Sequence, residues 1–202
     1  MVKKIGILTS GGDCGGLNAA IRSIFFRAKN KYNMTVFGIR NGTTGLLTRP
    51  IDYVELTRET FSGYLLKQGG TFLGTTNKAS STNFLDENAN KIDHSKLVIE
   101  GYHQLGLAGL IIIGGDGSMQ ILQNLAKKGK LNIVAIPKTI DNDVGATDSS
   151  IGFDTAVQVA TQALDNLHST AVSHSRSMIL EVMGRDAGHI ALSSGIAGGA
   201  DI

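Results

Sequence analysis

Acidic residues crowd the stretch AIPKTIDNDVGATDSSIGFDTA, residues 135–156, directly after a short apolar run. Side chains alternate along an extended strand, so Thr139, Asp141 and Asp143 would share one face if the strand continues past its proline. Two neighbouring carboxylates repel each other, which raises the pKa of one of them toward the value that a general base needs. Lys138 would point elsewhere unless the turn re-aims it. An acidic loop that is merely solvated at the surface remains the alternative.

Glycines dominate a second stretch, TSGGDCGGLNAA, residues 9–20, between a predicted strand and a predicted helix. Glycine lets a backbone turn sharply, and backbone N–H groups at a helix N-terminus can face an anion. The spacing matches neither the P-loop pattern nor G-x-G-x-x-G. A tight turn without any ligand therefore stays open as the alternative. Cys14 has no evident base beside it and is interpreted as a small filler, not a nucleophile.

Asp116 lies between two glycines in a third stretch, IIIGGDGSMQ, residues 111–120. A carboxylate placed in this way is well exposed to bind Mg²⁺, usually through water, beside a phosphate. It could instead cap the following helix, which is predicted to begin at Ser118. The flanking glycines favour the role of a metal ligand.

Two arginines flank an apolar run in the fourth stretch, HSRSMILEVMGRDAG, residues 174–188. Arg176 precedes the run and Arg185 follows it, and arginine at the carboxyl end of a strand suits a phosphate. For either arginine alone, a surface salt bridge is the commoner arrangement. The five histidines of the chain show no metal-ligand spacing such as H-x-x-x-H.

Short apolar runs alternate with longer amphipathic ones along the chain. The pattern predicts an α/β fold, with an open parallel sheet of Rossmann-like type and helices on both of its faces. Ligands of such sheets bind beyond the carboxyl ends of the strands, where the glycine-rich, Asp116 and acidic stretches fall. Strands are predicted at 4–9, 34–39, 107–115, 131–137 and 175–184, and helices at 17–30, 59–68, 95–106, 118–129 and after an N-cap at Asp154.

The composition excludes several classes of protein. A hydrophobic content of 42% in 202 residues supports a folded core. Lys and Arg number 19 against 17 for Asp and Glu, which gives no electrostatic case for a nucleic-acid or membrane partner. A single cysteine excludes an internal disulfide framework and a Cys-based zinc cluster. The longest apolar run, 107–113, is far too short for a membrane span, and the first residues turn polar too early for a signal peptide, so we expect a cytoplasmic protein.

The final residues, SSGIAGGADI, resemble the start of another strand with no terminating helix. We therefore expect the chain to be the N-terminal part of a longer one, and a short natural tail is the alternative. Residues 1–150 are expected to form a first α/β domain that ends with the acidic loop. Residues 151–202 are expected to begin a second α/β domain.

Five segments together resemble the 6-phosphofructokinases, in that family's order and over nearly the whole chain. They are GGDCGGLNAAIR, GGTFLG, IGGDGS, PKTIDNDVGATDSSIGFDTA and EVMGRDAGHIAL. The combination of T-I-D-N-D with M-G-R is the most specific part. GGDGS alone is also similar to NAD kinases and lipid kinases, which lack T-I-D-N-D. A different nucleotide-dependent kinase, and a module that binds nucleotide without turnover, are the rival hypotheses.

The resemblance implies a phosphofructokinase-type fold that transfers a phosphoryl group from ATP to the 1-hydroxyl of fructose 6-phosphate, with Mg²⁺ as cofactor. Asp141 matches the general base, with Thr139, Asp143 and Lys138 completing the catalytic group, and Asp116 matches the magnesium-linked residue. The implied ATP contacts are Gly12, Asn77, Lys78, Gly115, Asp116, Gly117 and Ser118, and the implied fructose 6-phosphate contacts are Thr139, Ile140, Asp141, Arg176, Met183, Gly184 and Arg185.

Two positions bear on the choice of donor within this family. Pyrophosphate users tend to carry Asp after the Asp of G-G-D, whereas this chain has Gly117, which leaves room for ATP. Pyrophosphate users also typically have a lysine where this chain has Lys138. The resemblance thus favours ATP and keeps a pyrophosphate-dependent enzyme as the alternative.

Other positions bear on assembly and control. Arg176 matches an arginine that reaches the substrate of a neighbouring subunit, which implies a homo-oligomer, a dimer or a tetramer. Asn77 and Lys78 stand where many bacterial members have an arginine. Of the arginine pair that binds allosteric effectors in some bacterial members, Arg22 is present and Phe26 replaces the second, which argues against ADP or phosphoenolpyruvate control of that type.

Overall fold

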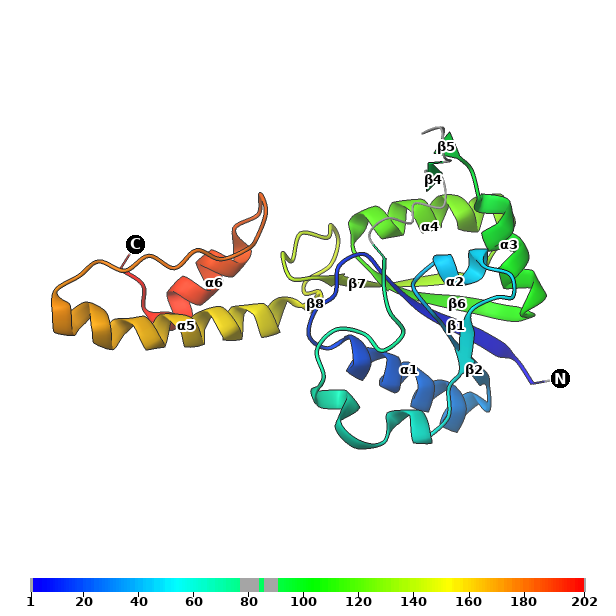
Figure 1. The fold of residues 1–202 in the computed structure, drawn as a ribbon, viewed down its shortest axis with the longest axis horizontal. Helices are drawn as coiled ribbons and strands as arrows, with labels where there is room; N and C mark the ends of the chain where they lie inside the picture. Colours follow the sequence, from blue (N-terminus) through cyan, green and yellow to red (C-terminus); the bar gives the residue numbers. More distant parts are fainter. Residues whose placement is uncertain (1, 77–83, 86–90, 202) are drawn as a thin grey trace. The chain divides into compact units, whose positions relative to one another are not determined.

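The computed structural model describes residues 2–76, 84–85 and 91–201 (Figure 1). The chain separates into two compact units, residues 1–137 and residues 138–202. The elements in chain order are β1 (Lys4–Ser10), α1 (Leu17–Tyr32), β2 (Thr35–Ile39), α2 (Thr44–Leu47), β3 (Tyr53–Glu55), the 3-10 helices η1 (Glu59–Phe61) and η2 (Gly63–Lys67), β4 (Phe84–Leu85), β5 (Lys91–Ile92), α3 (Ser95–Gln104), β6 (Leu107–Gly114), α4 (Asp116–Gly129), β7 (Ile133–Thr139), β8 (Ile151–Gly152), α5 (Phe153–His174) and α6 (His189–Gly198).

A mostly parallel sheet has the strand order β3-β2-β1-β6-β7-β8, and its strands from β3 to β7 up to Pro137 form the frame of the first unit. β8 pairs only with Lys138 and Thr139 at the end of β7, and these residues belong to the second unit. β1 runs parallel to β2 and β6, and β6 runs parallel to β7, as the alternation of strands and helices predicted. The antiparallel edge strand β3 was not predicted, because three residues are too few to show a period. A second sheet consists of β4 and β5 alone.

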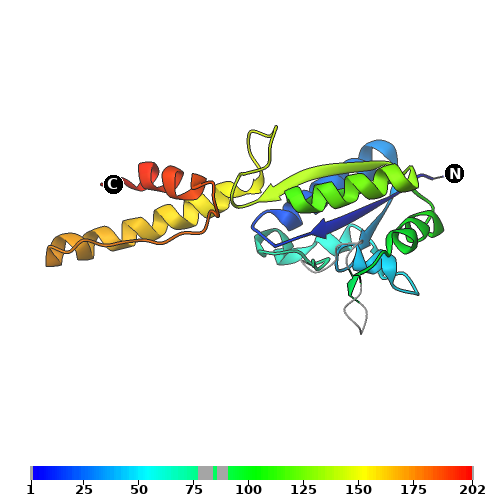
Figure 2. The ribbon, with the colours of Figure 1, turned by 90° about the horizontal axis from the view of Figure 1, so that it is seen from above.

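Helices cover both faces of this sheet, as predicted: α1 lies on one face, and α2, α3 and α4 lie on the other (Figures 1 and 2). Leu8 of β1 and Ile112 of β6 are fully buried beneath the second group of helices. Across the sheet, α1 buries Leu17, Ile21 and Phe25, which are spaced by four residues along one helical face. Burial of a side chain of this size is worth about 1.5–3 kcal/mol, so the two layers hold the strands in one register.

Two local predictions about helices are corrected. α5 begins at Phe153 with Gly152 as its N-cap, at φ +109°, so Asp154 lies in the first turn and is not the cap. The predicted single helix over 59–68 is two short 3-10 helices. Ser62 is extended and Gly63 has φ +73°, so the chain turns between them.

The second unit consists mainly of α5 and α6, and the strand predicted over 175–184 is wrong. Residues 176–184 are neither helix nor strand, because no described segment offers them the hydrogen-bond ladder that a strand requires. Ile179, in the middle of this segment, is 94% exposed. The prediction that the final residues contain no helix is also wrong, because α6 extends to Gly198. α6 packs on α5, and the Nε2 atom of His168 lies 2.9 Å from the carbonyl oxygen of Gly198.

No helix within the described ranges is both long and apolar enough to cross a membrane. The 22 residues of α5 carry several polar and acidic side chains. The structure of this part of the chain therefore contains no candidate for a transmembrane helix.

An ion pair joins the start of α3 to the end of α4. The Asp93 carboxylate accepts a hydrogen bond from Lys128 Nζ at 2.7 Å, and it also accepts from the backbone N–H of Ser95 at 2.8 Å and from the Ser95 hydroxyl. The hydrogen bond from Lys128, followed by those from Ser95, holds the pKa of Asp93 well below its usual value of 3.8. Both charged side chains are half-exposed, so solvent screens the pair.

We predict that this carboxylate makes the stability of the first unit depend on acid pH. A group whose pKa is lowered by folding stabilises the folded state above its unfolded pKa, and that contribution is lost as the pH falls through the folded value. Asp93→Asn should therefore lower the denaturation midpoint at pH 7, and its difference from the parent protein should shrink once the pH falls below 3.8. Urea titrations of both proteins at several pH values test this; a difference that stays constant down to the lowest pH contradicts it.

Candidate functional site

The strands β1 and β6 end side by side, since Ser10 pairs with Gly114. Residues 11–16, the glycine loop, leave β1 at this edge and lead into α1. Gly11 has φ +84° and Gly16, the N-cap of α1, has φ +95°, conformations that favour glycine. A Cβ added at Gly12 would meet no atom within 4 Å, so there is space beside the loop. A glycine loop before a helix N-terminus is suited to an anion, as the sequence suggested.

A second segment, residues 68–76, lies against the glycine loop; we call it the strap. The Thr75 hydroxyl donates to the carbonyl oxygen of Gly11 at 2.6 Å, and the N–H of Gly11 donates to the carbonyl oxygen of Thr76 at 3.3 Å. Both backbone groups of Gly11 are therefore held by the strap. The strap ends where Asn77 and Lys78 begin, and these two predicted ATP contacts lie outside the described residues.

The third predicted stretch forms the first turn of α4. The helix begins at Asp116 rather than at Ser118, and its N-cap is Gly115. Asp116 is therefore not the cap; its exposed carboxylate accepts a hydrogen bond from Gln120 Nε2 at 3.3 Å. A Cβ added at Gly117 would meet open space. The structure thus places Asp116, Gly117 and Ser118 in one turn at the amino end of a helix, where the helix dipole favours negative charge.

The exposed carboxylate of Asp116 can be compared with what a magnesium ion needs. Within the described ranges, no three His, Cys, Asp or Glu side chains are grouped closely enough to enclose a metal. Magnesium seldom needs such a cage, because it keeps several waters and binds through one or two carboxylates together with substrate phosphates. An exposed carboxylate beside a helix N-terminus therefore fits that donor set, and Asp116 would hold the ion.

The acidic loop belongs to the second unit and is held by three side chains. The N–H of Asp141 donates to the Thr139 hydroxyl at 3.1 Å. The Ser150 hydroxyl donates to the carbonyl oxygen of Thr139 at 2.7 Å, and the N–H of Ser150 donates to Asn142 Oδ1 at 2.9 Å. Ser150 is 4% exposed, so the bonds that it makes lie at the partly buried base of the loop.

The simple alternation predicted for this loop is wrong. β7 ends at Thr139, and Asn142 has φ +52°, so the extended strand does not continue to Asp141 and Asp143. Thr139 and Asp141 are brought together by a turn instead of by a shared strand face. Lys138 is 5% exposed, within β7. Asn142 and Ser150 were missed by sequence reasoning, although Asn between two Asp residues is a common signal for a left-handed turn.

Four of the predicted sugar-phosphate contacts, Arg176, Met183, Gly184 and Arg185, lie at the two ends of residues 176–184, which we call the extended segment (Figure 1). Arg176 directly follows α5, where its N–H donates to the carbonyl oxygen of Ala171 at 3.0 Å. Gly184 at φ +154° and Arg185 at φ +53° form the turn that precedes α6, and Met183 is 75% exposed. Neither arginine takes part in the three ion pairs found among the described residues, so the surface salt bridge suggested for them finds no support.

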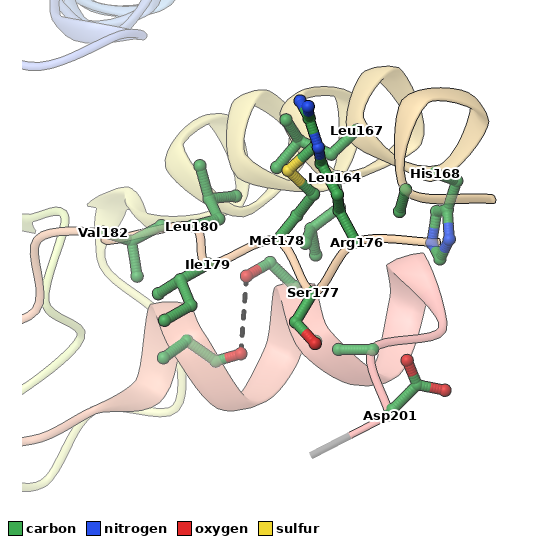
Figure 3. A pocket seen from close by; sticks show the side chains of 15 residues that line it. Leu164, Leu167, His168, Arg176, Ser177, Met178, Ile179, Leu180, Val182 and Asp201 are labelled. Carbon is green, nitrogen blue, oxygen red and sulfur yellow. Dashed lines mark hydrogen bonds between the residues drawn. The ribbon is translucent and has the colours of Figure 1, made fainter. Parts of the chain in front are cut away.

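A cavity of about 670 Å³ lies within the second unit, between α5, the extended segment and α6 (Figure 3). Arg176, Ser177, His168 and Asp201 contribute polar groups to it. Its other walls are mainly leucine, isoleucine, methionine and valine side chains from 164 to 182. Arg176 is the one arginine or lysine among these lining residues, whereas a phosphate is usually bound by several charged or polar donors, so we do not assign the cavity to a sugar phosphate.

Phe26 stands where some bacterial members of the family in question have the second arginine of the effector-binding pair. The Arg22 guanidinium lies 4.6 Å from the centre of the Phe26 ring, and that of Arg58 lies 5.7 Å from it. Phe26 also makes an edge contact with Phe25, with ring centres 5.2 Å apart. Phe26 therefore packs against the arginines and offers no cation of its own.

Comparisons with known proteins agree with this geometry. A model of the family described as phosphofructokinase matches residues 4–202. ATP-dependent 6-phosphofructokinase 1 of Synechocystis sp. (strain ATCC 27184 / PCC 6803 / Kazusa) is 58% identical over 201 residues, which are 100% of this chain and 55% of that protein. ATP-dependent 6-phosphofructokinase 3 of Bacteroides thetaiotaomicron is 48% identical over 98% of this chain and 57% of its own length. The chain thus spans about half the length of the curated relatives it matches.

Solved structures agree as well. The phosphofructokinase of Saccharomyces cerevisiae matches 98% of this chain and 28% of its own chain, with a TM-score of 0.82 and 32% identity. The pyrophosphate-dependent phosphofructokinase of Marinobacter aquaeolei matches 98% of this chain and 50% of its own, with a TM-score of 0.78 and 23% identity, which shows a shared fold alone. The resemblance seen in the sequence motifs is confirmed, and the chain belongs to the phosphofructokinase family.

Proposed function

We propose that the complete protein transfers the terminal phosphoryl group of ATP to the 1-hydroxyl of fructose 6-phosphate, a reaction of glycolysis. The observation that carries this proposal is the match of the whole chain, acidic loop included, to relatives named ATP-dependent 6-phosphofructokinase. The structure supports it with a glycine loop and a helix N-terminus at the sheet edge, and with an acidic loop held in a defined turn.

Asp141 is the proposed general base. Its carboxylate accepts the proton of the 1-hydroxyl while that oxygen attacks the terminal phosphorus, and the bond from phosphorus to the oxygen of ADP breaks. The hydrogen bond from the Asp141 N–H to Thr139 fixes the backbone that carries this carboxylate. Asp143 is proposed to support the base, and Lys138 and the Thr139 hydroxyl to act near the transferred phosphoryl group.

The donor is proposed to bind at the edge of the first unit. Gly12 and the turn of Gly115, Gly117 and Ser118 would contact its phosphates through backbone groups and a hydroxyl. Mg²⁺, held through Asp116, would neutralise phosphate charge when bound. Asn77 and Lys78 are proposed as further phosphate contacts on the basis of the family resemblance alone.

The acceptor is proposed to bind through Thr139, Ile140 and Asp141 and through the residues around the extended segment, Arg176, Met183, Gly184 and Arg185. Neither of the two arginines forms an ion pair with a described residue, and a guanidinium group suits a sugar phosphate. Arg176 is proposed to act in the site of a neighbouring subunit, so the enzyme would be a homo-oligomer in the cytoplasm. Residues 1–150 and 151–202 are the proposed donor-binding domain and the beginning of the acceptor-binding domain.

Pyrophosphate is the second candidate donor, favoured by Lys138. Pyrophosphate-dependent enzymes are among the proteins that share this fold. The open space beside Gly117 argues for ATP, because a side chain there would occupy room that the rest of the nucleotide needs. A lysine can serve either donor, so the space at Gly117 supports ATP as the proposed donor.

Removal of the proposed base is the first test. In the complete enzyme, Asp141→Asn should lower kcat by about a hundredfold or more, the usual worth of a general base, with little change in substrate binding. Asp148→Asn, which neutralises a carboxylate in the same loop, is the matched control and should retain most of kcat. Steady-state kinetics with purified proteins decide the matter, and normal turnover by the Asp141 variant would refute the assignment.

The turn at Asn142 provides a second test. Alanine at φ +52° costs about 1–2 kcal/mol, whereas glycine adopts this conformation readily. Both Asn142→Ala and Asn142→Gly lose the bonds to Ser150, but only the alanine variant adds backbone strain. We expect faster amide exchange across 139–150 and a lower kcat in both, with the larger effect for alanine. If the two variants show the same amide exchange and the same kcat, the left-handed backbone conformation of residue 142 does not contribute to the position of the loop.

The choice of donor is tested with each donor separately. The complete enzyme, given fructose 6-phosphate and Mg²⁺, should turn over faster with ATP than with pyrophosphate. Gly117→Asp should weaken the use of ATP strongly, because it adds bulk and negative charge beside the phosphates, while magnesium binding should fall less. Faster turnover with pyrophosphate than with ATP in the parent enzyme contradicts the proposal.

A further inference from the structure

Asn18 is a buried polar residue to which neither the motifs nor the proposed mechanism gives a role. It is the second residue of α1, directly after the glycine loop, and its side chain is 2% exposed. A buried amide of this kind is costly unless both its donor and its acceptor are satisfied. The partners that Asn18 selects therefore indicate what it does.

Both partners of Asn18 are backbone groups of the strap. Its Nδ2 donates to the carbonyl oxygen of Gln68 at 3.2 Å, and its Oδ1 accepts from the N–H of Phe72 at 3.0 Å. A carbonyl can only accept and an N–H can only donate, so this pair of bonds requires one orientation of the amide. One side chain thus holds two points of the strap, four residues apart, against the first turn of α1.

The hydroxyl groups of Thr9 and Thr71 hold the later residues of the strap. The Thr9 hydroxyl donates to the carbonyl oxygen of Gly74 at 2.8 Å and lies 3.1 Å from the Thr71 hydroxyl. Each hydroxyl has one proton, so Thr71 must donate to Thr9, and it accepts in turn from the N–H of Leu73 at 3.3 Å. Thr9 is 1% exposed, which makes a break in this chain expensive.

The last two residues of the strap form hydrogen bonds with Gly11. Thr75 and Thr76 bond the carbonyl oxygen and the N–H of that residue, which has φ +84°. The backbone torsions of Gly11 set the direction of the next peptide group, that of Gly12. A loop rich in glycine has little stiffness of its own, so contacts from outside must select one conformation.

We propose that Asn18 is a positioning residue for the phosphoryl donor: by clamping the strap at Gln68 and Phe72, it holds Gly11 and thereby orients the Gly11–Gly12 backbone toward the donor phosphates. This inference rests on the proposed function, which places the donor at Gly12. Asn18 itself touches no substrate in this scheme and acts only through the strap.

The test uses Asn18→Leu, which keeps the size of the side chain and removes both bonds, and Asn18→Ser, a smaller uncharged change. Both are made in the complete enzyme. Asn30→Ser is the matched control, because Asn30 lies exposed near the other end of α1 and accepts a hydrogen bond from Arg58. The KM for ATP should rise about tenfold, the effect of losing one good buried hydrogen bond, while the KM for fructose 6-phosphate stays unchanged within error. A purely structural role would lower the active fraction without separating the two KM values, and that outcome would overturn the proposal.

Amide exchange provides a readout that does not depend on catalysis. Peptides covering 9–16 and 68–76 should exchange faster in both Asn18 variants, whereas peptides of β6 and α3 should not change. If the parent enzyme makes no fructose 1,6-bisphosphate from ATP, the proposed function fails, and the exchange experiment still decides whether Asn18 controls the glycine loop. Unchanged exchange over 9–16 would show that it does not.

A double-mutant cycle tests whether Asn18 acts through the strap. Thr75→Val removes the hydroxyl that bonds Gly11 and keeps the shape of the side chain. If both residues act on Gly11 through one strap, the combined Asn18→Leu and Thr75→Val variant should raise the KM for ATP by less than the product of the single effects. Fully independent effects of the two changes would contradict a shared route.

Discussion

The parallel pairing of β1 with β6 is the contact on which the first unit depends. It extends from Lys4 to Ser10, and it places the end of β1 beside Gly114 at the end of β6. The strands can pair in this register because their apolar side chains are buried on both faces, by α1 on one side and by α3 and α4 on the other. Parallel strands end at the same edge, so the glycine loop and the first turn of α4 emerge together.

Hydrogen bonds from polar side chains then give shape to loops that have little stiffness of their own. In the first unit, Asn18, Thr9 and Thr75 join the strap to β1, α1 and the glycine loop. In the second unit, Ser150 and Asn142 hold the acidic loop in a turn. These residues are uncharged and mostly buried, and their contribution is to select one backbone conformation. Asp141 lies in the loop whose backbone is selected in this way.

The two units differ in how well they bury apolar side chains. The first has a continuous core, whereas Ala160 and Ile190 are the only hydrophobic residues of the described part of the second unit that are buried. Ile179, Met183, Leu192 and Ile196 are largely exposed there. The chain spans 55% of the length of two of its curated relatives, so the remaining 45% of those proteins has no counterpart in these two units. The extended state of residues 176–184 fits this shortage of packing partners.

The parallel strands β1, β2, β6 and β7, the helices α1, α3 and α4 and the family could all be predicted from the sequence. Hydrophobic periodicity and glycine placement are local signals, and the acidic motif is specific. Three features could be seen only in the folded structure. Asp116 starts α4, Thr139 and Asp141 are hydrogen-bonded in a turn, and Asn18 is bonded to the strap. The folded structure also decided that 176–184 is not a strand and that α6 is a helix. These outcomes depend on which hydrogen-bond or packing partners a residue has in the folded chain. The partner of Asn18, for example, lies 50 residues away in the sequence, and a local sequence pattern cannot identify it.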